Sequence, residues 1–465
     1  MVFSARSLPK IMGAGLLTAA AVAVLAQLAG MGAAGGGAAG WALPILLSAI
    51  GLWLGGFLPD HVTALGFFAL LLLFKLAPPD VVLSGFTSSA LWLVLAGLVL
   101  GLAMEETGLG KRLAALAHGL EGLSYAKLVA VVVLMGLAAI FFMPSATGRI
   151  IMFLGIVGPL AVHLGYQPGS RGYSGLMLAA AFGTFLPAFS VLPSNVPNMV
   201  LAGTLEKLTG QSLTFVDFFV LHFPVLGLGR ALAVWGLVCL LYADKPGPIQ
   251  GAGAATPGPM SRGERRLALI LVVAVCLWVT DSWHHVSPAW VALAGAVLCL
   301  VPGLGMLGRD ALRKVNLSLI LHVGAVIGLG AVANKLGLGA WMAETILGWM
   351  PLSGQGGMHD WAVLVALPML LGVLTTAPGV PAVLVPMADV LAARSGFSVV
   401  NTAMLQVPGL STILLPHQVP PLMAAIPISG VPYHEFVRLC LLMAGISVVI
   451  LLPLDALWWM VLGRM

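Results

Sequence analysis

The fold of this chain depends on the sequence Phe142-Met143-Pro144-Ser145-Ala146-Thr147-Gly148-Arg149, which interrupts a long apolar run. The run covers residues 128–165, nearly twice the roughly 20 residues that one membrane crossing needs. A helix that enters at residue 128 and turns at Pro144 returns to the side from which it came. A break at membrane depth is tolerated only where protein shields it or where it faces a watery cavity. The sequence therefore predicts a re-entrant hairpin whose tip is a candidate site.

A second stretch of the same design lies at 361–394, where two apolar segments flank Thr375-Thr376-Ala377-Pro378-Gly379. Interrupted hydrophobic segments at corresponding positions of two halves are typical of the binding site of a secondary transporter. We therefore expect one re-entrant hairpin in each half of the chain.

The composition is that of a membrane protein. Of the 465 residues, 60% are hydrophobic and 8% are charged, which predicts an all-α polytopic membrane protein with about 11 transmembrane helices. The basic residues behind the net charge of +5 are scattered between the apolar runs, so we expect them to orient the chain in the bilayer and not to bind nucleic acid.

The sequence shows no intramembrane set of carboxylates, histidines or a serine with a base, so an enzyme is not expected.

The chain divides into two predicted repeats. The expected parts are an N-terminal helix with a Gly/Ala tract at 1–40, a first repeat at 41–243 with its hairpin at 128–165, a cytoplasmic linker at 244–266, and a second repeat at 267–465 with its hairpin at 361–394. A secretory signal that is cleaved is the alternative for the first part. We favour a retained helix with its amino terminus in the cytoplasm.

Each repeat is expected to contain about five spans, one of them broken. The predicted breaks lie at 183–187 and 193–197 in the first repeat and at 408–409 and 416–421 in the second. A cytoplasmic amino terminus places most Lys and Arg residues on that side, as the excess of positive charge inside requires. The repeats then start from opposite sides and are inverted, so the first hairpin enters from the cytoplasm and the second from outside.

The segments 53–59 and 91–109, both hairpins and the step Pro197-Asn198 resemble the divalent anion/sodium symporter family, which carries dicarboxylates, citrate or sulfate. The likeness covers nearly the whole chain from about residue 41. It implies inverted repeats, usually in a homodimer, with a transport domain that moves as a rigid body against a scaffold domain. We expect the protein in the bacterial inner (plasma) membrane, with a small anionic substrate and the lipid bilayer as its partners.

In members of that family each hairpin tip reads Ser-Asn-Thr, and the tips and facing breaks hold sodium and the substrate carboxylates. The corresponding tips are Ser145-Ala146-Thr147 and Thr376-Ala377-Pro378, so both lack asparagine. The resemblance implies Ser145, Thr375 and Thr376 as sodium ligands. The missing amide oxygens weaken such a site, because a hard cation needs several oxygen ligands. Backbone carbonyls at the breaks remain as possible ligands.

Arg149 is the sharpest single signal, because a guanidinium at membrane depth costs several kcal/mol unless it is paired or hydrated. Our hypothesis is that Arg149 binds an anionic substrate, or that it supplies the positive charge that sodium provides in relatives. The alternative is that it snorkels to the cytoplasmic surface or pairs with a neighbour.

The two predicted breaks contain further candidates for substrate binding. These are Ser194, Asn195 and Asn198 in the first repeat, and His417 and Gln418 in the second. They are able to donate to a carboxylate or sulfate, and His417 is able to relay a proton. The alternative is that they satisfy backbone groups freed by the breaks.

The function that these patterns predict is secondary active transport of a small anion of the dicarboxylate, tricarboxylate or sulfate class, by elevator-type alternating access. The resemblance ranks sodium first as the coupling ion, and no other cofactor is expected. Proton coupling, anion exchange and an ion antiporter of the same superfamily are the alternatives. A membrane subunit that does not transport is the remaining interpretation.

Overall fold

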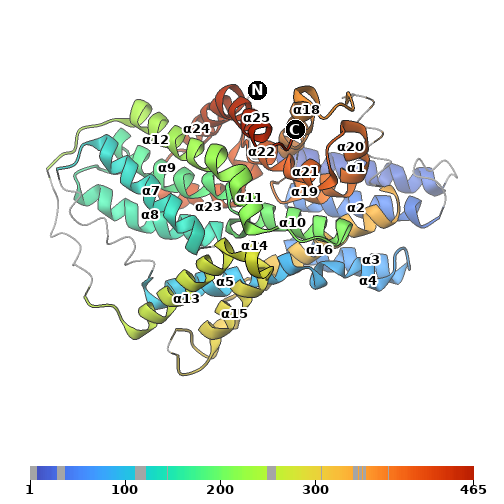
Figure 1. The fold of residues 1–465 in the computed structure, drawn as a ribbon, viewed down its shortest axis with the longest axis horizontal. Helices are drawn as coiled ribbons and strands as arrows, with labels where there is room; N and C mark the ends of the chain where they lie inside the picture. The colour runs from blue at the N-terminus through green and yellow to red at the C-terminus, as the bar shows by residue number, and fades with distance from the viewer. Residues whose placement is uncertain are drawn as a thin grey trace.

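The computed structural model describes residues 8–28, 37–109, 122–143, 145–248, 258–304, 306–338, 344, 348, 352–374 and 376–465. Every regular element in these ranges is a helix (Figure 1), which confirms the predicted all-α fold. Pro144 of the first hairpin and Thr375 of the second lie outside the described residues, as do parts of the Gly/Ala tract and of the linker.

The first half of the chain contains one long helical hairpin and one helix that is broken into short pieces. Its elements are α1 (Leu8–Leu28), α2 (Ala38–Gly55), α3 (Asp60–Leu73), α4 (Pro79–Val82), η1 (Ser84–Thr87), α5 (Ser89–Thr107), α7 (Tyr125–Phe142), α8 (Ala146–His163), α9 (Arg171–Phe185), η2 (Pro187–Ser190), η3 (Leu192–Ser194), α10 (Val196–Thr209), α11 (Phe215–His222), η4 (Phe223–Gly227) and α12 (Leu228–Tyr242). The predicted hairpin at 128–165 corresponds to α7 and α8.

The second half contains a similar, but not identical, series of helices. They are α13 (Arg262–Val279), α14 (Asp281–His284), α15 (Pro288–Leu300), η5 (Ala311–Lys314), α16 (Leu317–Lys335), α18 (Met358–Leu374), α19 (Gly379–Leu384), η6 (Val385–Met387), α20 (Ala388–Ser395), α21 (Val399–Met404), α22 (Gln406–Leu410), η7 (Pro416–Gln418), α23 (Pro420–Ser429), α24 (Tyr433–Ile446), η8 (Ser447–Leu451) and α25 (Leu452–Val461). In both halves the last long helix contains one π-helical turn, η4 or η8. This recurrence supports two repeats, whereas their boundaries and inverted orientation stay predictions.

Seven helices among the described residues are long and apolar enough to cross a membrane, or eight if one bent pair is counted as a span. Further apolar helices of 10–17 residues accompany them. The chain is therefore a polytopic helical membrane protein, as predicted. The expected total of about 11 spans stays a prediction.

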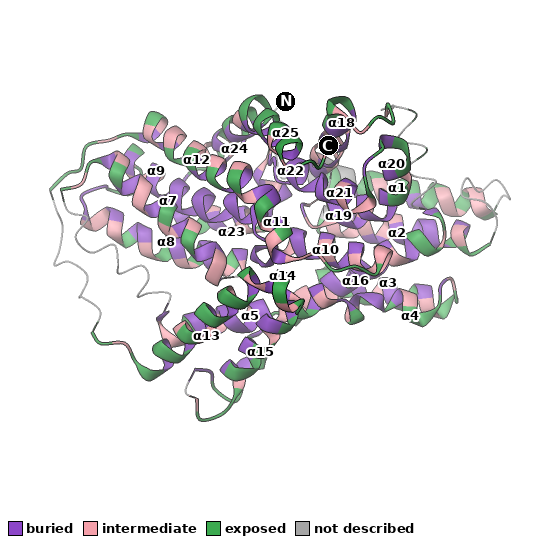
Figure 2. Ribbon diagram, viewed as in Figure 1, coloured by how far each residue is buried: buried purple, intermediate pink, exposed green. Residues whose placement is uncertain are grey.

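The broken helix of the first half is surrounded by protein. Along Arg171–Ser190, 89% of the span is buried, against 39% along Tyr433–Val461. Figure 2 shows the buried residues concentrated in the middle of the molecule, with exposed residues on the outer helices. A chain break at membrane depth requires this shielding, because lipid cannot satisfy freed backbone groups.

Two predicted boundaries differ from the structure. The helix α13 begins at Arg262, inside the segment predicted as linker, because Ser261 and Glu264 form a reciprocal capping box at its start. The predicted break at 408–409 was wrong, since these residues lie within α22 and the chain unwinds just after Leu410. Pro408 is tolerated there because the first turn of a helix needs no N–H at that position.

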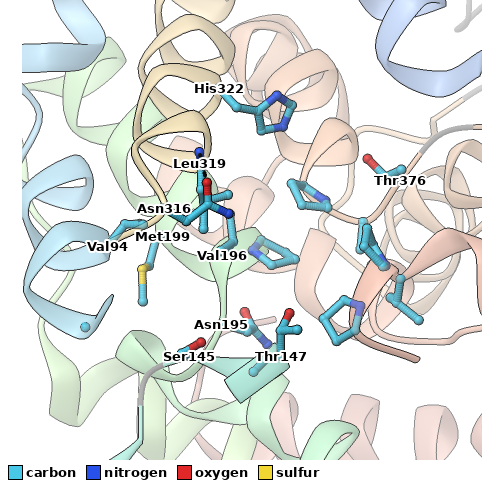
Figure 3. Close-up of a pocket in the computed structure, with 18 of the residues that line it drawn as sticks. Val94, Ser145, Thr147, Asn195, Val196, Met199, Asn316, Leu319, His322 and Thr376 are labelled. Carbon is cyan, nitrogen blue, oxygen red and sulfur yellow. Dashed lines mark hydrogen bonds between the residues drawn. The ribbon is translucent and has the colours of Figure 1, made fainter. Parts of the chain in front are cut away.

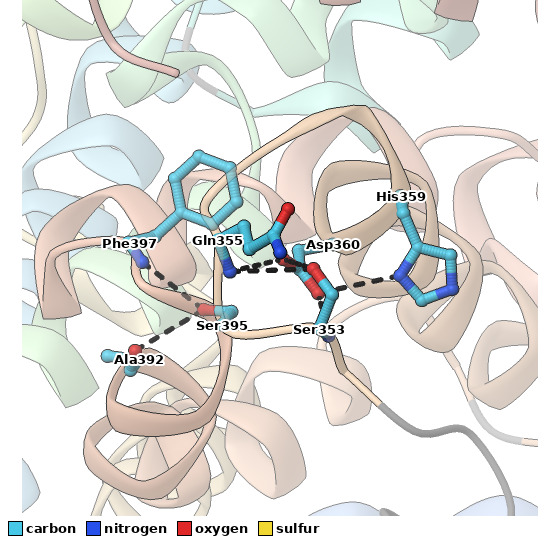
Figure 4. A network of polar contacts seen from close by, with 7 residues as sticks. All are labelled: Ser353, Gln355, His359, Asp360, Ala392, Ser395 and Phe397. Atoms are coloured by element: carbon cyan, nitrogen blue, oxygen red, sulfur yellow. Dashed lines mark hydrogen bonds and ion pairs between the residues drawn. The ribbon is translucent and has the colours of Figure 1, made fainter.

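The buried carboxylate of Asp360 ties the loop before the second hairpin to that hairpin (Figure 4). It accepts hydrogen bonds from the Ser353 amide at 2.5 Å, from the Ser353 hydroxyl at 2.6 Å and from the Gln355 amide at 3.1 Å. The amide of Gly356 donates to the carbonyl of Ser395 at the end of α20. The loop is therefore fixed to both legs of the hairpin.

Candidate functional site

One cavity of about 320 Å³ brings together the two hairpin tips and the two chain breaks (Figure 3). The tips and breaks contribute Ser145, Ala146, Thr147, Asn195, Val196, Pro197, Thr376, Ala377, Pro378, Val419, Pro420 and Pro421. Segments that are far apart in the sequence therefore meet at one place, as two facing chain reversals require.

Several helices begin at this cavity. The amino ends of α8, α10 and α23 supply lining residues, and the second tip leads into α19. On the opposite wall α3 begins at Asp60 and α16 follows Asn316, and both residues line the cavity. Each helix amino end carries a partial positive charge and N–H groups that have no partner within the helix. The cavity is therefore a favourable place for an anion.

The first tip offers free hydrogen-bond donors. The hydroxyl of Ser145 caps α8 by accepting from the Gly148 amide at 3.3 Å. The amides of Ala146 and Thr147 open the helix, so they have no carbonyl partner within it. Together with the Thr147 hydroxyl, they are able to receive a carboxylate or a sulfate oxygen.

The second tip uses its donors internally. The amide of Ala377 donates to the Gln418 carbonyl at 2.8 Å, and the amide of Gly379 donates to the Thr376 carbonyl at 2.8 Å. The helix α23 begins with Pro420 and Pro421, which have no N–H. At this tip the hydroxyl of Thr376 remains as a donor toward the cavity.

Asn195 adds a donor beside the first tip. Its side-chain oxygen accepts from the Asn198 amide at 3.1 Å and so caps α10. Its Nδ2 is buried and has no hydrogen-bond partner among the described residues. Figure 3 shows Asn195 close to Ser145 and Thr147 on one side of the cavity. This amide is therefore able to donate to a ligand oxygen.

Arg149 is fully buried behind the first tip and does not line the cavity. Its guanidinium donates to the main-chain carbonyl of Thr184 at 3.1 Å, to that of Ser194 at 3.4 Å, and to that of Met143. These carbonyls come from the hairpin and from the broken helix. A cation bound at the first break would need the same oxygens, and a fixed guanidinium already uses them.

The other predicted residues of the breaks serve the backbone. The hydroxyl of Ser194 donates to the Ile140 carbonyl at 2.8 Å, and Asn198 Nδ2 donates to the carbonyls of the first break, including that of Val191 at 3.0 Å. The side-chain oxygen of Gln418 accepts from two successive amides, at 414 and 415, at 2.7 Å each. His417 is half-buried outside the cavity lining. Ser194, Asn198 and Gln418 thus form hydrogen bonds with backbone groups, and their part in substrate binding stays a prediction.

The wall opposite the tips contains polar residues that sequence reasoning missed. Asp60, Asn316 and His322 line it together with Trp53. An ionisable residue inside an apolar span is a signal that would have singled out His322. The sequence does not single out Asp60 in this way, because acidic residues are common at the amino end of a helix.

Seven or eight candidate spans among the described residues, with chain breaks shielded by protein, define an integral membrane protein of the polytopic helical class. The family model described as the sodium:sulfate symporter transmembrane region matches residues 10–465, and the chain belongs to this family. The family consists of membrane transporters, which confirms the prediction that the chain is not an enzyme. Among the described residues no group of three or more His, Cys, Asp or Glu side chains is placed to hold a metal ion.

The curated relatives are distant. A "Membrane protein" of Cupriavidus necator is 25% identical over 324 residues, which cover 64% of this chain and 63% of that protein. The inner membrane protein YbhI of Escherichia coli is 26% identical over 303 residues, which cover 61% of each. The chain therefore spans less than two thirds of these relatives. An L-tartrate/succinate antiporter of Escherichia coli is 25% identical over 406 residues, which cover 81% of this chain and 80% of the antiporter.

A solved structure shares the fold. The crystal structure of the Alcanivorax borkumensis YdaH transporter aligns with a TM-score of 0.57 and 16% sequence identity. The alignment covers 87% of this chain and 99% of that one. At this identity the likeness concerns the fold alone.

Proposed function

We propose that this chain is a secondary transporter of a small dianion and that the anion binds at the amino ends of α8 and α10. The observation that carries the proposal is the convergence of helix amino ends from both hairpin tips and both breaks on one cavity. Peptide dipoles at these ends, together with the amides at the start of α8, stabilise negative charge without a lysine or arginine in the described cavity lining.

The donor arrangement favours a dicarboxylate. One carboxylate would accept from the amides of Ala146 and Thr147 and from Asn195 Nδ2, and the second would reach Thr376 on the other tip. The cavity volume of about 320 Å³ accommodates a small organic dianion. A relative named for L-tartrate and succinate supports the same class. A tricarboxylate and sulfate are the next candidates.

Arg149 supplies a fixed positive charge at the first tip in this proposal. The guanidinium is permanently charged and its partners are neutral carbonyls. A buried charge without a counter-charge is costly, so an anion in the adjacent cavity is stabilised by it. A sodium ion is then not needed at this tip, which favours anion exchange or proton coupling over sodium coupling.

The movement that we propose is of the elevator type. The hairpins α7–α8 and α18–α20 and the broken helices would form the moving domain, and α3, α5 and α16 would belong to the scaffold. The location of the cavity supports this division, because its lining comes from both groups. A homodimer in the bacterial inner membrane, with a cytoplasmic amino terminus, is part of the same proposal.

Uptake by the purified full chain in liposomes tests the proposed function. Labelled succinate, tartrate, citrate and sulfate are offered with and without a sodium gradient, and with and without unlabelled anion inside. We expect succinate or tartrate uptake that internal anion stimulates and that sodium does not change. No flux of any of these anions would contradict transport, and strict sodium dependence would contradict the role of Arg149.

A further inference from the structure

The cavity wall opposite the tips carries a carboxylate and an imidazole that the proposed anion site does not use. Asp60 opens α3 and His322 lies in the second turn of α16, and both line the cavity. Trp53 fixes their arrangement, since its Nε1 donates to the Asp60 carbonyl at 3.2 Å. Its ring also meets the His322 imidazole edge-on, with the ring centroids 4.9 Å apart. Figure 3 shows His322 across the cavity from Ser145 and Thr147.

The two side chains differ in their exposure. Asp60 is exposed and lies in the first turn of α3. His322 is partly buried, and its Nδ1 has no hydrogen-bond partner among the described residues. Histidine is the side chain that changes charge between about pH 5 and 8, so His322 is the variable member of the pair.

Among the described residues that line the cavity, Asp60 and His322 are the titratable side chains. The helix α3 also carries His61, whose Nδ1 is hydrogen-bonded to the Ser318 hydroxyl at 2.9 Å. Other titratable residues on elements that pack against α16 lie outside the cavity lining, and these are Asp80, Glu105, Glu106, Glu206 and Lys207. The elements η1, α19 and η6 contain none. Arg149, buried in the first turn of α8 behind the first tip, contributes a constant positive charge.

We propose that Asp60 and His322 make this wall responsive to protons, so that a proton on His322 favours anion occupancy of the cavity. The proposal rests on the proposed function, because it concerns the same cavity. With a neutral imidazole the wall carries the negative charge of Asp60, which repels an anion at the tips. A proton taken from solution by His322 cancels that charge. Anion and proton then occupy the site together, and no covalent step is involved.

The test measures succinate binding to the purified full chain between about pH 5.5 and 8, with affinity expressed per concentration of the succinate dianion. For the wild type we expect about three- to tenfold tighter binding at the acid end. His322→Asn keeps the wall negative, so it should bind weakly at every pH. Asp60→Asn removes the repulsion and leaves the imidazole without a counter-charge, so binding should be tight and flat. His61→Asn is the matched control and should keep the wild-type profile.

The outcomes separate this proposal from the proposed function. A pH profile that both Asp60→Asn and His322→Asn retain would overturn the proton-responsive wall while leaving anion binding intact. Absence of succinate binding by the folded wild type at every pH would overturn both. Size-exclusion profiles and melting temperatures show whether each variant is folded. The shape of the pH profile is the discriminating readout, because a purely structural role of the pair would not change it.

Discussion

The Nε of Arg149 donates a 3.1 Å hydrogen bond to the main-chain carbonyl of Thr184, where the first broken helix begins to unwind. This contact joins the first hairpin to the break that it faces. The guanidinium also reaches the Ser194 carbonyl on the far side of the break. A single buried side chain therefore holds together the elements that form one wall of the cavity.

Replacing Arg149 by Gln should reduce succinate uptake in liposomes by about thirtyfold or more, because the charge behind the anion site is lost. Arg313→Gln is the control, since Arg313 is 84% exposed and lies in η5. Undiminished uptake by Arg149→Gln at an unchanged substrate affinity would refute the role of this residue.

A smaller replacement at the same position should allow rescue by a free cation. In Arg149→Ala the carbonyls of Met143, Thr184 and Ser194 lose their donor, so sodium or guanidinium ions should restore part of the uptake. The same ions should leave wild-type uptake unchanged. If neither ion changes uptake by a folded Arg149→Ala protein, the carbonyls are not a cation site.

Thr147→Val should weaken succinate binding by about three- to tenfold, because one hydrogen bond to the ligand is lost at nearly constant side-chain volume. Thr209→Val is the matched control, as the Thr209 hydroxyl donates to the Leu205 carbonyl at 2.9 Å at the other end of α10. Isothermal titration compares the two. Equal affinities would remove the Thr147 hydroxyl from the site.

Gln418→Ala should destabilise the protein by about 1–3 kcal/mol, since two partly buried amides lose their common acceptor. Thermal unfolding in detergent measures the effect. The control is Gln167→Ala, because Gln167 is exposed. An unchanged melting temperature for Gln418→Ala would show that water or another group satisfies the second break.

Asp360→Asn should also destabilise the protein, by about 1.5–3 kcal/mol, because hydrogen bonds to a charged acceptor are lost in the network of Figure 4. Its effect on succinate affinity should be small, since Asp360 does not line the cavity. Asp310→Asn, at a side chain that is 75% exposed, is the control for stability. A large loss of affinity without a loss of stability would contradict this assignment.

The parts of the fold that follow local chemistry were predictable from the sequence. The apolar run at 128–165 is too long for one crossing and contains a proline, so a turn near Pro144 was predicted, and α7 ends at Phe142 while α8 begins at Ala146. The predicted break at 408–409 was wrong because proline breaks the interior of a helix but is tolerated in its first turn. Only the structure shows that α22 begins at Gln406.

The contacts between distant segments were not predictable in this way. Asp60 and His322 reach the cavity only because α3 and α16 pack across from the hairpin tips. The partners of Arg149 are main-chain carbonyls, which every residue possesses, so no residue type marks them in advance. Sequence reasoning therefore proposed the tips, which line the cavity, and did not propose the opposite wall.

An electron cryo-microscopy map of the purified protein with succinate tests the central claim most directly. We predict ligand density in the cavity between the amino end of α8 and Thr376, within hydrogen-bonding distance of the Thr147 amide and of Asn195 Nδ2. Succinate density elsewhere in the protein, or a first hairpin that passes through the membrane as one continuous helix, would contradict the account.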